Sequence, residues 1–463
     1  MAIAPEIIQQ LRQQLGADKL LTEATDRLAY GYDNSRQQAL PDLVVFPESH
    51  DDVLAIVQLC AQHAIPLTAR GRGTGTTGAT VPTQGGIVLS TERMNRILEI
   101  SPDDRMMVVE PGVTNQAVQD TAAEHGFFWP PDPTSAAVCT VGGNLAYNSA
   151  GPRAVKYGTP REHTLGLRAV TGSGEEIRTG TRTTKGVVGY DFTRLLIGSE
   201  GSLAVITEAT LKLTPLPECK RTFQAIYADI GAATRAVSRI MAQPVVPCAL
   251  EFIDGTAIEM IRHYSQADLP EKAGALLMIE IDGPASAMPE MQKAIHDAAA
   301  CDGLLGFQAA NTDEEIKALW ATRKALSPAL RNVAPKKINE DVVVPVSQIP
   351  SLIEGLEQLA AQHEVTIVNF GHAGNGNIHV NLLVDPDDHT QLARAEACLD
   401  AVFSLVLELG GTLSGEHGIG LVKKAFVSRE LDPVTLRLMH EVKQVFDPRN
   451  ILNPDKTPAL TDK

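Results

Sequence analysis

The chain has 463 residues, of which 44% are apolar, enough to build the cores of two or three domains. Its 40 basic and 56 acidic side chains give a net charge of −16, which argues against nucleic-acid binding, because an acidic chain repels a phosphate backbone. The six cysteines are scattered without a CxxC pair. This argues against a disulfide framework, a thiolate zinc site or an iron–sulfur cluster, and it favours a reducing, cytoplasmic compartment.

The N-terminal residues 1–14 predict a helix with Ile7, Ile8 and Leu11 on one face. They lack the basic start and apolar run of a signal peptide. No run of about 18 apolar residues occurs, so we expect no transmembrane segment, while peripheral attachment to a membrane stays open.

Two strand–helix–strand cycles follow in residues 43–129. The first comprises a strand at 43–46, a helix at 51–63 capped by Ser49, a strand at 66–69 and, after a glycine-rich loop, a strand at 86–89. The second comprises a strand at 106–110, a helix at 115–124 and a strand at 127–129. We therefore expect two small α/β units in succession.

Three loops rich in Gly, Asn, Ser and Thr occupy residues 70–78, 140–151 and 198–203. The first matches GxGxxG by letter, but a strand follows it instead of a helix, and it lacks the GK[ST] of a P-loop. Together the loops offer many backbone N–H donors to a long diphosphate ligand. The alternative is that they only connect strands.

The chain beyond residue 217 alternates more highly charged helices and strands. Thr312-x-x-Glu315 forms a capping box, and it opens a helix that carries Arg323 on the same face as Trp320. A cation on an inward face needs a partner, and an anionic substrate would supply one; the alternative is that Arg323 reaches solvent by snorkelling. We divide the chain into domains at 1–217, 218–430 and 431–463, and the last contains a helix at 433–446 that we expect Asp432 to cap.

Two histidine motifs stand out in the second half of the chain. His372 and His379 flank a Gly/Asn loop between predicted strands, and Glu416-His417 lies in a glycine-flanked bend. Two imidazoles and one carboxylate form a metal set with open positions, suited to Zn²⁺, Mn²⁺ or Fe²⁺. An imidazole such as that of His417 is suited to act as a base near neutral pH. The alternatives are ordinary turn histidines, or a metal without catalysis.

The glycine loops, with Pro131-Asp132-Pro133-x-Ser135 and Gly198-Ser199-Glu200-Gly201, resemble the FAD-binding fold of the vanillyl-alcohol oxidase and p-cresol methylhydroxylase type. The resemblance spans residues 43–217 and implies FAD held between two subdomains. Because residues 70–78 contain no His or Cys, it implies a non-covalent flavin. The cofactor-binding residues it implies are Arg70, Gly71, Gly73, Thr74, Gly75, Pro131, Asp132, Ser135, Gly142, Gly143, Asn144, Asn148, Gly151, Glu200, Gly201 and Ile206.

The spacing His372-x6-His379-x-Asn381 and the sequence Gly415-Glu416-His417-Gly418 are similar to those of FAD-linked D-2-hydroxyacid dehydrogenases. This resemblance implies an α+β fold, with a C-terminal cap domain on the FAD-binding fold. It implies that His372, His379 and Glu416 are the metal ligands and that His417 is the catalytic base. Arg323, Ser327, Lys337 and Asn381 match the residues that hold the substrate, with Lys336 competing with Lys337.

The resemblance further implies oxidation of a small (R)-2-hydroxy acid, with D-lactate as first choice and glycolate or D-2-hydroxyglutarate as alternatives. It implies FAD and a divalent metal, with zinc first and manganese or iron as alternatives. The electron acceptor stays open between a quinone, a cytochrome and an electron-transfer flavoprotein. The oligomeric state also stays open, with a homodimer as one option. The rival interpretation is a non-catalytic, flavin-bearing subunit that only passes electrons.

Overall fold

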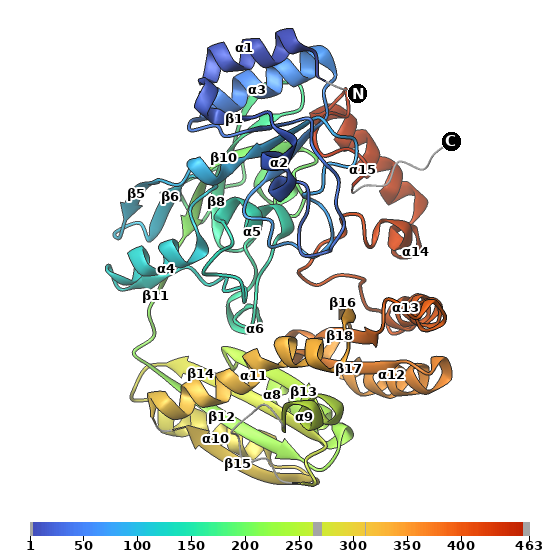
Figure 1. Cartoon of the computed structure of the whole chain (residues 1–463). Helices are drawn as coiled ribbons and strands as arrows, with labels where there is room; N and C mark the ends of the chain where they lie inside the picture. The colour runs from blue at the N-terminus through green and yellow to red at the C-terminus, as the bar shows by residue number, and fades with distance from the viewer. Residues whose placement is uncertain (1–2, 263–270, 311, 457–463) are drawn as a thin grey trace. The chain divides into compact units, whose positions relative to one another are not determined.

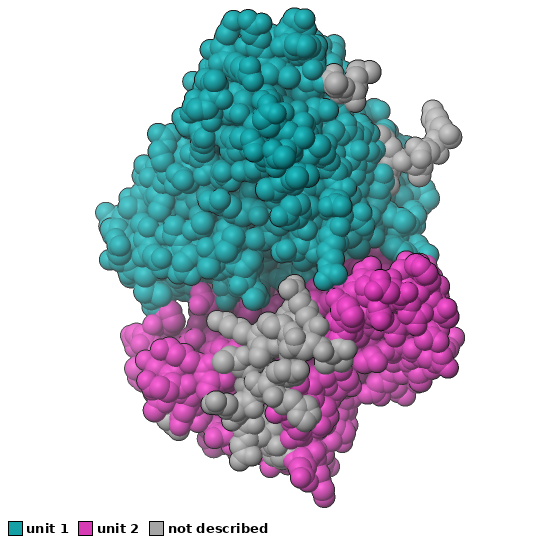
Figure 2. Space-filling model, viewed as in Figure 1, with its two compact units in different colours: residues 1–151, 158–216, 416–463 teal, residues 152–157, 217–415 magenta. Residues whose placement is uncertain are grey.

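The computed structural model describes residues 3–262, 271–310 and 312–456, which form two compact units (Figure 2). Unit 1 comprises residues 1–151, 158–216 and 416–463, and unit 2 comprises residues 152–157 and 217–415. The chain leaves unit 1 after Leu216 and returns to it at Glu416. The domain bounds expected from the sequence are 217/218 and 430/431, so the second expected boundary lies beyond this return.

Unit 1 begins with a small sheet built around a strand–helix–strand connection (Figure 1). Its elements are α1 (Pro5–Leu15), β1 (Leu20–Leu21), α2 (Ala24–Arg27), β2 (Leu43–Val45), α3 (His50–His63), β3 (Leu67–Arg70) and β4 (Ile87–Ser90). The strand order is β1-β2-β4-β3, and β2 and β3 both run parallel to β4. The Oγ of Ser49 accepts a hydrogen bond from the Asp52 N–H at 3.1 Å, so the predicted cap of α3 is confirmed.

The second sheet of unit 1 is antiparallel throughout, with the order β5-β6-β10-β8-β9. The elements of this part are β5 (Ile97–Ser101), β6 (Met106–Val109), α4 (Asn115–Ala123), β7 (Phe127–Phe128), α5 (Val141–Tyr147), β8 (Thr164–Thr171), β9 (Glu176–Gly180), α7 (Phe192–Leu196), β10 (Ala204–Lys212) and β11 (Thr214–Pro215). The expectation of a second α/β unit is wrong here, because β7 pairs with β11 and not with β6. Instead, β6 pairs with β5 on one side and, on the other, with β10, which lies far along the chain.

The C-terminal segment of unit 1 carries α14 (Val427–Glu430) and α15 (Pro433–Phe446). The Asp432 side chain accepts hydrogen bonds from two N–H groups of the first turn of α15, as predicted. Val442 and Phe446 pack into the core beneath the antiparallel sheet. The buried ammonium of Lys443 donates to the carbonyl oxygens of Ser202 and Leu452, which ties the segment to unit 1. None of the described helices combines the length and hydrophobicity needed to cross a lipid bilayer.

Unit 2 is an antiparallel sheet with the order β15-β12-β14-β13-β17-β18-β16, packed against helices (Figure 1). Its elements are α6 (Ala154–Tyr157), β12 (Cys219–Tyr227), α8 (Ile230–Ala242), β13 (Ala249–Asp254), α9 (Gly255–Arg262), β14 (Ala275–Gly283), α10 (Met288–Ala299), β15 (Leu304–Ala310), α11 (Asp313–Val333), β16 (Lys336–Val343), α12 (Ile349–His363), β17 (Thr366–His372), β18 (Asn377–Val384) and α13 (His389–Glu408). The capping box of Thr312 and Glu315 opens α11 as predicted. Leu326 and Leu330 of α11 then pack on the face of the sheet that carries Phe370.

Candidate active site

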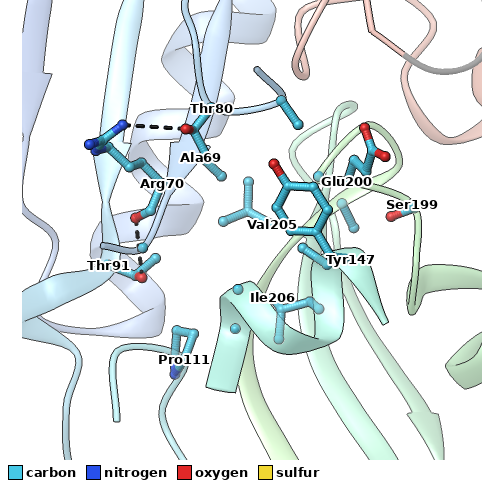
Figure 3. A pocket seen from close by; sticks show the side chains of 17 residues that line it. Ala69, Arg70, Thr80, Thr91, Pro111, Tyr147, Ser199, Glu200, Val205 and Ile206 are labelled. Atoms are coloured by element: carbon cyan, nitrogen blue, oxygen red, sulfur yellow. Dashed lines mark hydrogen bonds between the residues drawn. The ribbon is translucent and has the colours of Figure 1, made fainter. Parts of the chain in front are cut away.

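A pocket in unit 1 lies where the three glycine-rich loops meet (Figure 3). Seven of the residues expected to bind the cofactor line it, namely Arg70, Gly71, Gly142, Gly143, Glu200, Gly201 and Ile206. Lining residues that the sequence analysis missed include Thr80, Thr91, Pro111, Ala146, Tyr147, Ser199 and Val205. Ala146, Tyr147 and Ser199 lie within the glycine-rich loops that the sequence marks, whereas nothing in the local pattern of the other four marks them as ligand contacts.

The other nine expected cofactor residues do not line this pocket; several of them hold the loops in shape. They are Gly73, Thr74, Gly75, Pro131, Asp132, Ser135, Asn144, Asn148 and Gly151. A Cβ on Gly75 would lie 2.5 Å from the Tyr147 hydroxyl oxygen, so only glycine allows this approach. The Oδ1 of Asn148 accepts a hydrogen bond from the Arg161 N–H at 3.2 Å, and the Asp132 N–H donates to the Ala150 carbonyl at 2.8 Å.

Arg70 lines the pocket mainly as a support for its wall. Its guanidinium donates to the Tyr32 carbonyl at 2.7 Å, to the Ala29 carbonyl at 3.2 Å and to the Thr80 hydroxyl at 3.3 Å. Burial lowers the pKa of Arg70, yet these acceptors account for a cation that is only 7% exposed.

The pocket fits a flavin dinucleotide by two observations. Eight of its 17 lining residues are glycine or alanine, so a ligand can approach the backbone closely. The buried hydroxyl of Tyr147 makes no hydrogen bond of standard geometry with the described residues, although Thr77 and the Ala79 backbone lie near it, so this hydroxyl is open to a ligand or water.

In unit 2, one face of the sheet gathers the predicted imidazoles. His372 ends β17 and His379 lies on β18, with ring centroids 5.1 Å apart and planes at 83°. Because side chains alternate along a strand, Asn381 shares the face of His379, and the ladder places Asn339 of β16 opposite Asn381. Lys337 shares this face by the same alternation, whereas Lys336 lies on the other side of β16.

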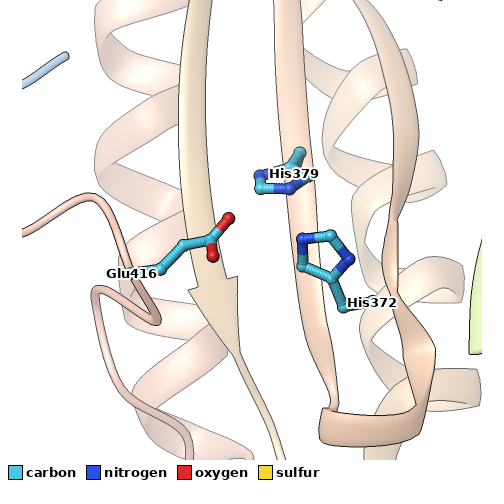
Figure 4. Close-up of side chains that lie close together, drawn as sticks. All are labelled: His372, His379 and Glu416. Atoms are coloured by element: carbon cyan, nitrogen blue, oxygen red, sulfur yellow. The ribbon is translucent and has the colours of Figure 1, made fainter. Parts of the chain in front are cut away.

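Glu416 completes a possible metal set with the two histidines. It directly follows Gly415, the last residue of unit 2, whose N–H donates to the Asp341 carboxylate at 2.8 Å. One ligand atom from each of His372, His379 and Glu416 lies within 4.8 Å of the others, and the three side chains point toward one another (Figure 4). Two imidazoles and one carboxylate at this spacing fit a divalent ion such as Zn²⁺ with open coordination positions.

A residue that the sequence analysis missed, Glu251 of β13, contacts both a metal-ligand candidate and a substrate-binding candidate. Its Oε1 lies 2.5 Å from the Nδ1 of His372, and its Oε2 accepts a hydrogen bond from the Nε of Arg323 at 2.9 Å. Burial by itself raises the pKa of the Glu251 carboxyl, but His372 and Arg323 outweigh it and hold that pKa below its usual range. The only sequence signal was a carboxylate inside an apolar strand.

The residues expected to bind the substrate differ in their hydrogen-bond partners. The Arg323 guanidinium lies 4.6 Å from the Phe370 ring centroid, and its side chain is 14% exposed, so this partly buried cation pairs with Glu251 instead of snorkelling. The Nδ2 of Asn381 donates to the carbonyl oxygens of Val368 and His379, and its buried Oδ1 has no partner among the described residues. The side chain of Ser327 lies outside the described residues.

The loop that carries His417 is held by residues of the unit 1 pocket. The hydroxyl of Thr77 donates to the His417 carbonyl at 3.2 Å. The Glu200 carboxylate accepts from the N–H groups of Ile419 and Gly420, at 2.6 and 2.9 Å. Burial raises the pKa of the Glu200 carboxyl, although these two donors act in the opposite direction.

Two family models match the chain, one described as FAD linked oxidases, C-terminal domain, over residues 216–457, and one described as FAD binding domain, over residues 41–180. The glycolate oxidase subunit GlcD of Bacillus subtilis (strain 168) is 39% identical over 98% of this chain and 97% of its own length. A D-lactate dehydrogenase of Archaeoglobus fulgidus is 35% identical over 92% of this chain and 95% of its own length.

A crystal structure of p-cresol methylhydroxylase with substrate bound covers 97% of this chain and 95% of its own, with a TM-score of 0.78 at 18% identity. This likeness concerns the fold alone, and it confirms the predicted p-cresol methylhydroxylase type. Taken with the family models and the relatives, it shows that the chain belongs to the FAD-linked oxidases and is a FAD-linked oxidoreductase.

Proposed function

We propose that the chain oxidises a small (R)-2-hydroxy acid to the 2-oxo acid, with non-covalent FAD and a divalent metal ion, and passes the electrons to an external acceptor. D-lactate is the first candidate substrate. The observation that carries the proposal is the set of His372, His379 and Glu416, with Arg323 linked to His372 through Glu251. A cation beside a metal set suits a substrate that has a carboxylate next to a hydroxyl.

Each protein group has a distinct role in this proposal. Arg323 binds the substrate carboxylate, and Lys337, Asn381 and Ser327 support the carboxylate and hydroxyl. His417 accepts the hydroxyl proton as general base. His372, His379 and Glu416 would hold the metal ion, which when bound lowers the pKa of the substrate hydroxyl. FAD, when bound in the unit 1 pocket, supplies the two-electron oxidant.

Two other substrates and one non-enzymatic role are alternatives. Glycolate is favoured by the similarity to the Bacillus subtilis glycolate oxidase subunit, and D-lactate by the similarity to the Archaeoglobus fulgidus D-lactate dehydrogenase. D-2-hydroxyglutarate differs by a second carboxylate, for which the chain would need a further cation. A non-catalytic electron-transfer subunit would keep the flavin but would not need the metal set or His417.

Anaerobic mixing separates these possibilities. The purified, FAD-loaded protein is mixed with D-lactate, L-lactate, glycolate or D-2-hydroxyglutarate, and the flavin absorbance near 450 nm is followed. We expect D-lactate to bleach the band and L-lactate, the matched control of opposite configuration, to leave it unchanged. Bleaching by glycolate alone would change the substrate, and no bleaching by any acid would support the electron-transfer role.

A further inference from the structure

Glu251 is almost completely enclosed, and its two carboxylate oxygens serve two different groups. It is 1% exposed on β13, where the ladder places it opposite His372 of β17. One oxygen contacts the His372 ring, and the other accepts a hydrogen bond from Arg323 of α11. A single rigid side chain therefore joins a proposed metal ligand to a proposed substrate-binding group.

The contact with His372 determines which ring nitrogen is available for a metal ion. When Nδ1 carries its hydrogen and donates it to a carboxylate, Nε2 keeps the lone pair and the ring cannot turn without losing the bond. The contact with Arg323 uses the Nε–H, and the terminal nitrogens of the guanidinium are separate donors in a fixed plane. Orienting this plane favours two-point binding of a carboxylate.

We propose that Glu251 is a positioning residue that orients His372 for the metal ion and Arg323 for the substrate carboxylate at the same time. This inference rests on the proposed function, because it assumes the metal and substrate roles of those residues. It predicts that the metal and substrate sites are coupled, so that loss of the Glu251 charge weakens both.

The competing explanation is that Glu251 only anchors α11 on the sheet. Glu280 of β14 allows this to be tested, because it is a second buried carboxylate on the same face, 6% exposed. It accepts hydrogen bonds from Trp320 Nε1 of α11 and from the Thr222 hydroxyl, both at 2.7 Å. Both carboxylates hold α11, but of the two, only Glu251 contacts a proposed metal ligand among the described residues.

The experiment compares the FAD-loaded wild type with Glu251→Gln and Glu280→Gln. Affinity for Zn²⁺ and for Mn²⁺ is measured by titration against a chelator in the absence of substrate, and KM and kcat are measured separately. We expect Glu251→Gln to weaken metal binding about 10- to 100-fold and to raise KM. We expect Glu280→Gln to keep wild-type metal affinity.

Several outcomes overturn the inference, and they can be told apart. Wild-type metal affinity in Glu251→Gln, or equal losses in both variants, leaves Glu251 as an anchor of α11 only. A wild type that binds neither metal ion refutes the metal part of the proposed function, and the inference falls with it. If Glu251→Gln does not fold, Glu251→Asp replaces it, since the shorter carboxylate keeps the charge but cannot reach both partners.

Discussion

The imidazole of His417 differs from those of His372 and His379 in its surroundings. The other two lie on neighbouring strands with their rings in contact, whereas His417 lies in a loop held through its carbonyl oxygen by Thr77. A loop imidazole next to a proposed metal ligand in sequence is well placed for proton transfer, which is the role we propose for His417.

Replacement of His417 by glutamine tests that role. Gln keeps a polar side chain but cannot accept the hydroxyl proton near neutral pH, so we expect the rate of flavin reduction to fall by about 10²–10⁴. Substrate affinity, measured from the concentration dependence in rapid mixing, should change little. His125→Gln, at an exposed position of unit 1, is the control. Near-normal reduction rates in His417→Gln would remove it as the base.

Single site residues can be predicted from the sequence when their side-chain type is itself informative. His372, His379 and Glu416 could be found because imidazoles and a carboxylate stand out beside glycine-rich loops, and the structure brings them together. Glu251 could not be found, because its contacts depend on the register between β13 and β17, which are more than a hundred residues apart in the chain. Such pairing is a property of the folded sheet.

Among the structural elements, the turn at Glu200 both lines the cofactor pocket and contacts the loop that carries His417. Both of its carboxylate oxygens accept backbone N–H groups of the loop just after His417, so the side chain clamps that loop. Glu200 itself has a positive φ of 52°, a backbone conformation that is costly for a residue with a side chain. We therefore infer that the clamp keeps the His417 loop in one conformation.

The variant Glu200→Gln should loosen this loop. An amide can accept one N–H through its oxygen, but its NH₂ group faces the second N–H and leaves it unsatisfied, at a cost of about 1–3 kcal/mol. We expect slower flavin reduction and faster hydrogen exchange at Ile419 and Gly420. Ser202→Ala, whose hydroxyl donates only within the same turn, is the matched control. Unchanged exchange in Glu200→Gln would contradict the clamp.

The elements also show where sequence patterns stop being informative. Ser49, the Thr312 capping box and Asp432 set helix starts through bonds to neighbouring residues, and all three are confirmed. The second α/β unit was wrong because β6 finds its partner in β10, and a local pattern does not encode which distant strand completes a sheet. Local signals thus fix helices better than sheet membership.

On the scale of the whole molecule, the residues that line one pocket bear on whether the flavin is bound covalently. Neither histidine nor cysteine occurs among the described residues that line it, and the first glycine loop contains neither. Tyr147 is the lining residue with a phenolic hydroxyl. Burial raises the pKa of this phenol, which keeps it protonated and a poor nucleophile toward the flavin ring.

We therefore expect that acid precipitation of the purified, yellow protein releases all of its flavin into the supernatant. The measurement is the flavin absorbance of the supernatant and the fluorescence of the pelleted polypeptide on a denaturing gel, since a covalent bond survives unfolding and a non-covalent one does not. Flavin fluorescence that stays with the polypeptide would contradict the prediction. In that event Tyr147→Phe identifies the attachment, because loss of the fluorescent band in this variant would locate the bond at the Tyr147 oxygen, and its persistence would place it elsewhere in the chain.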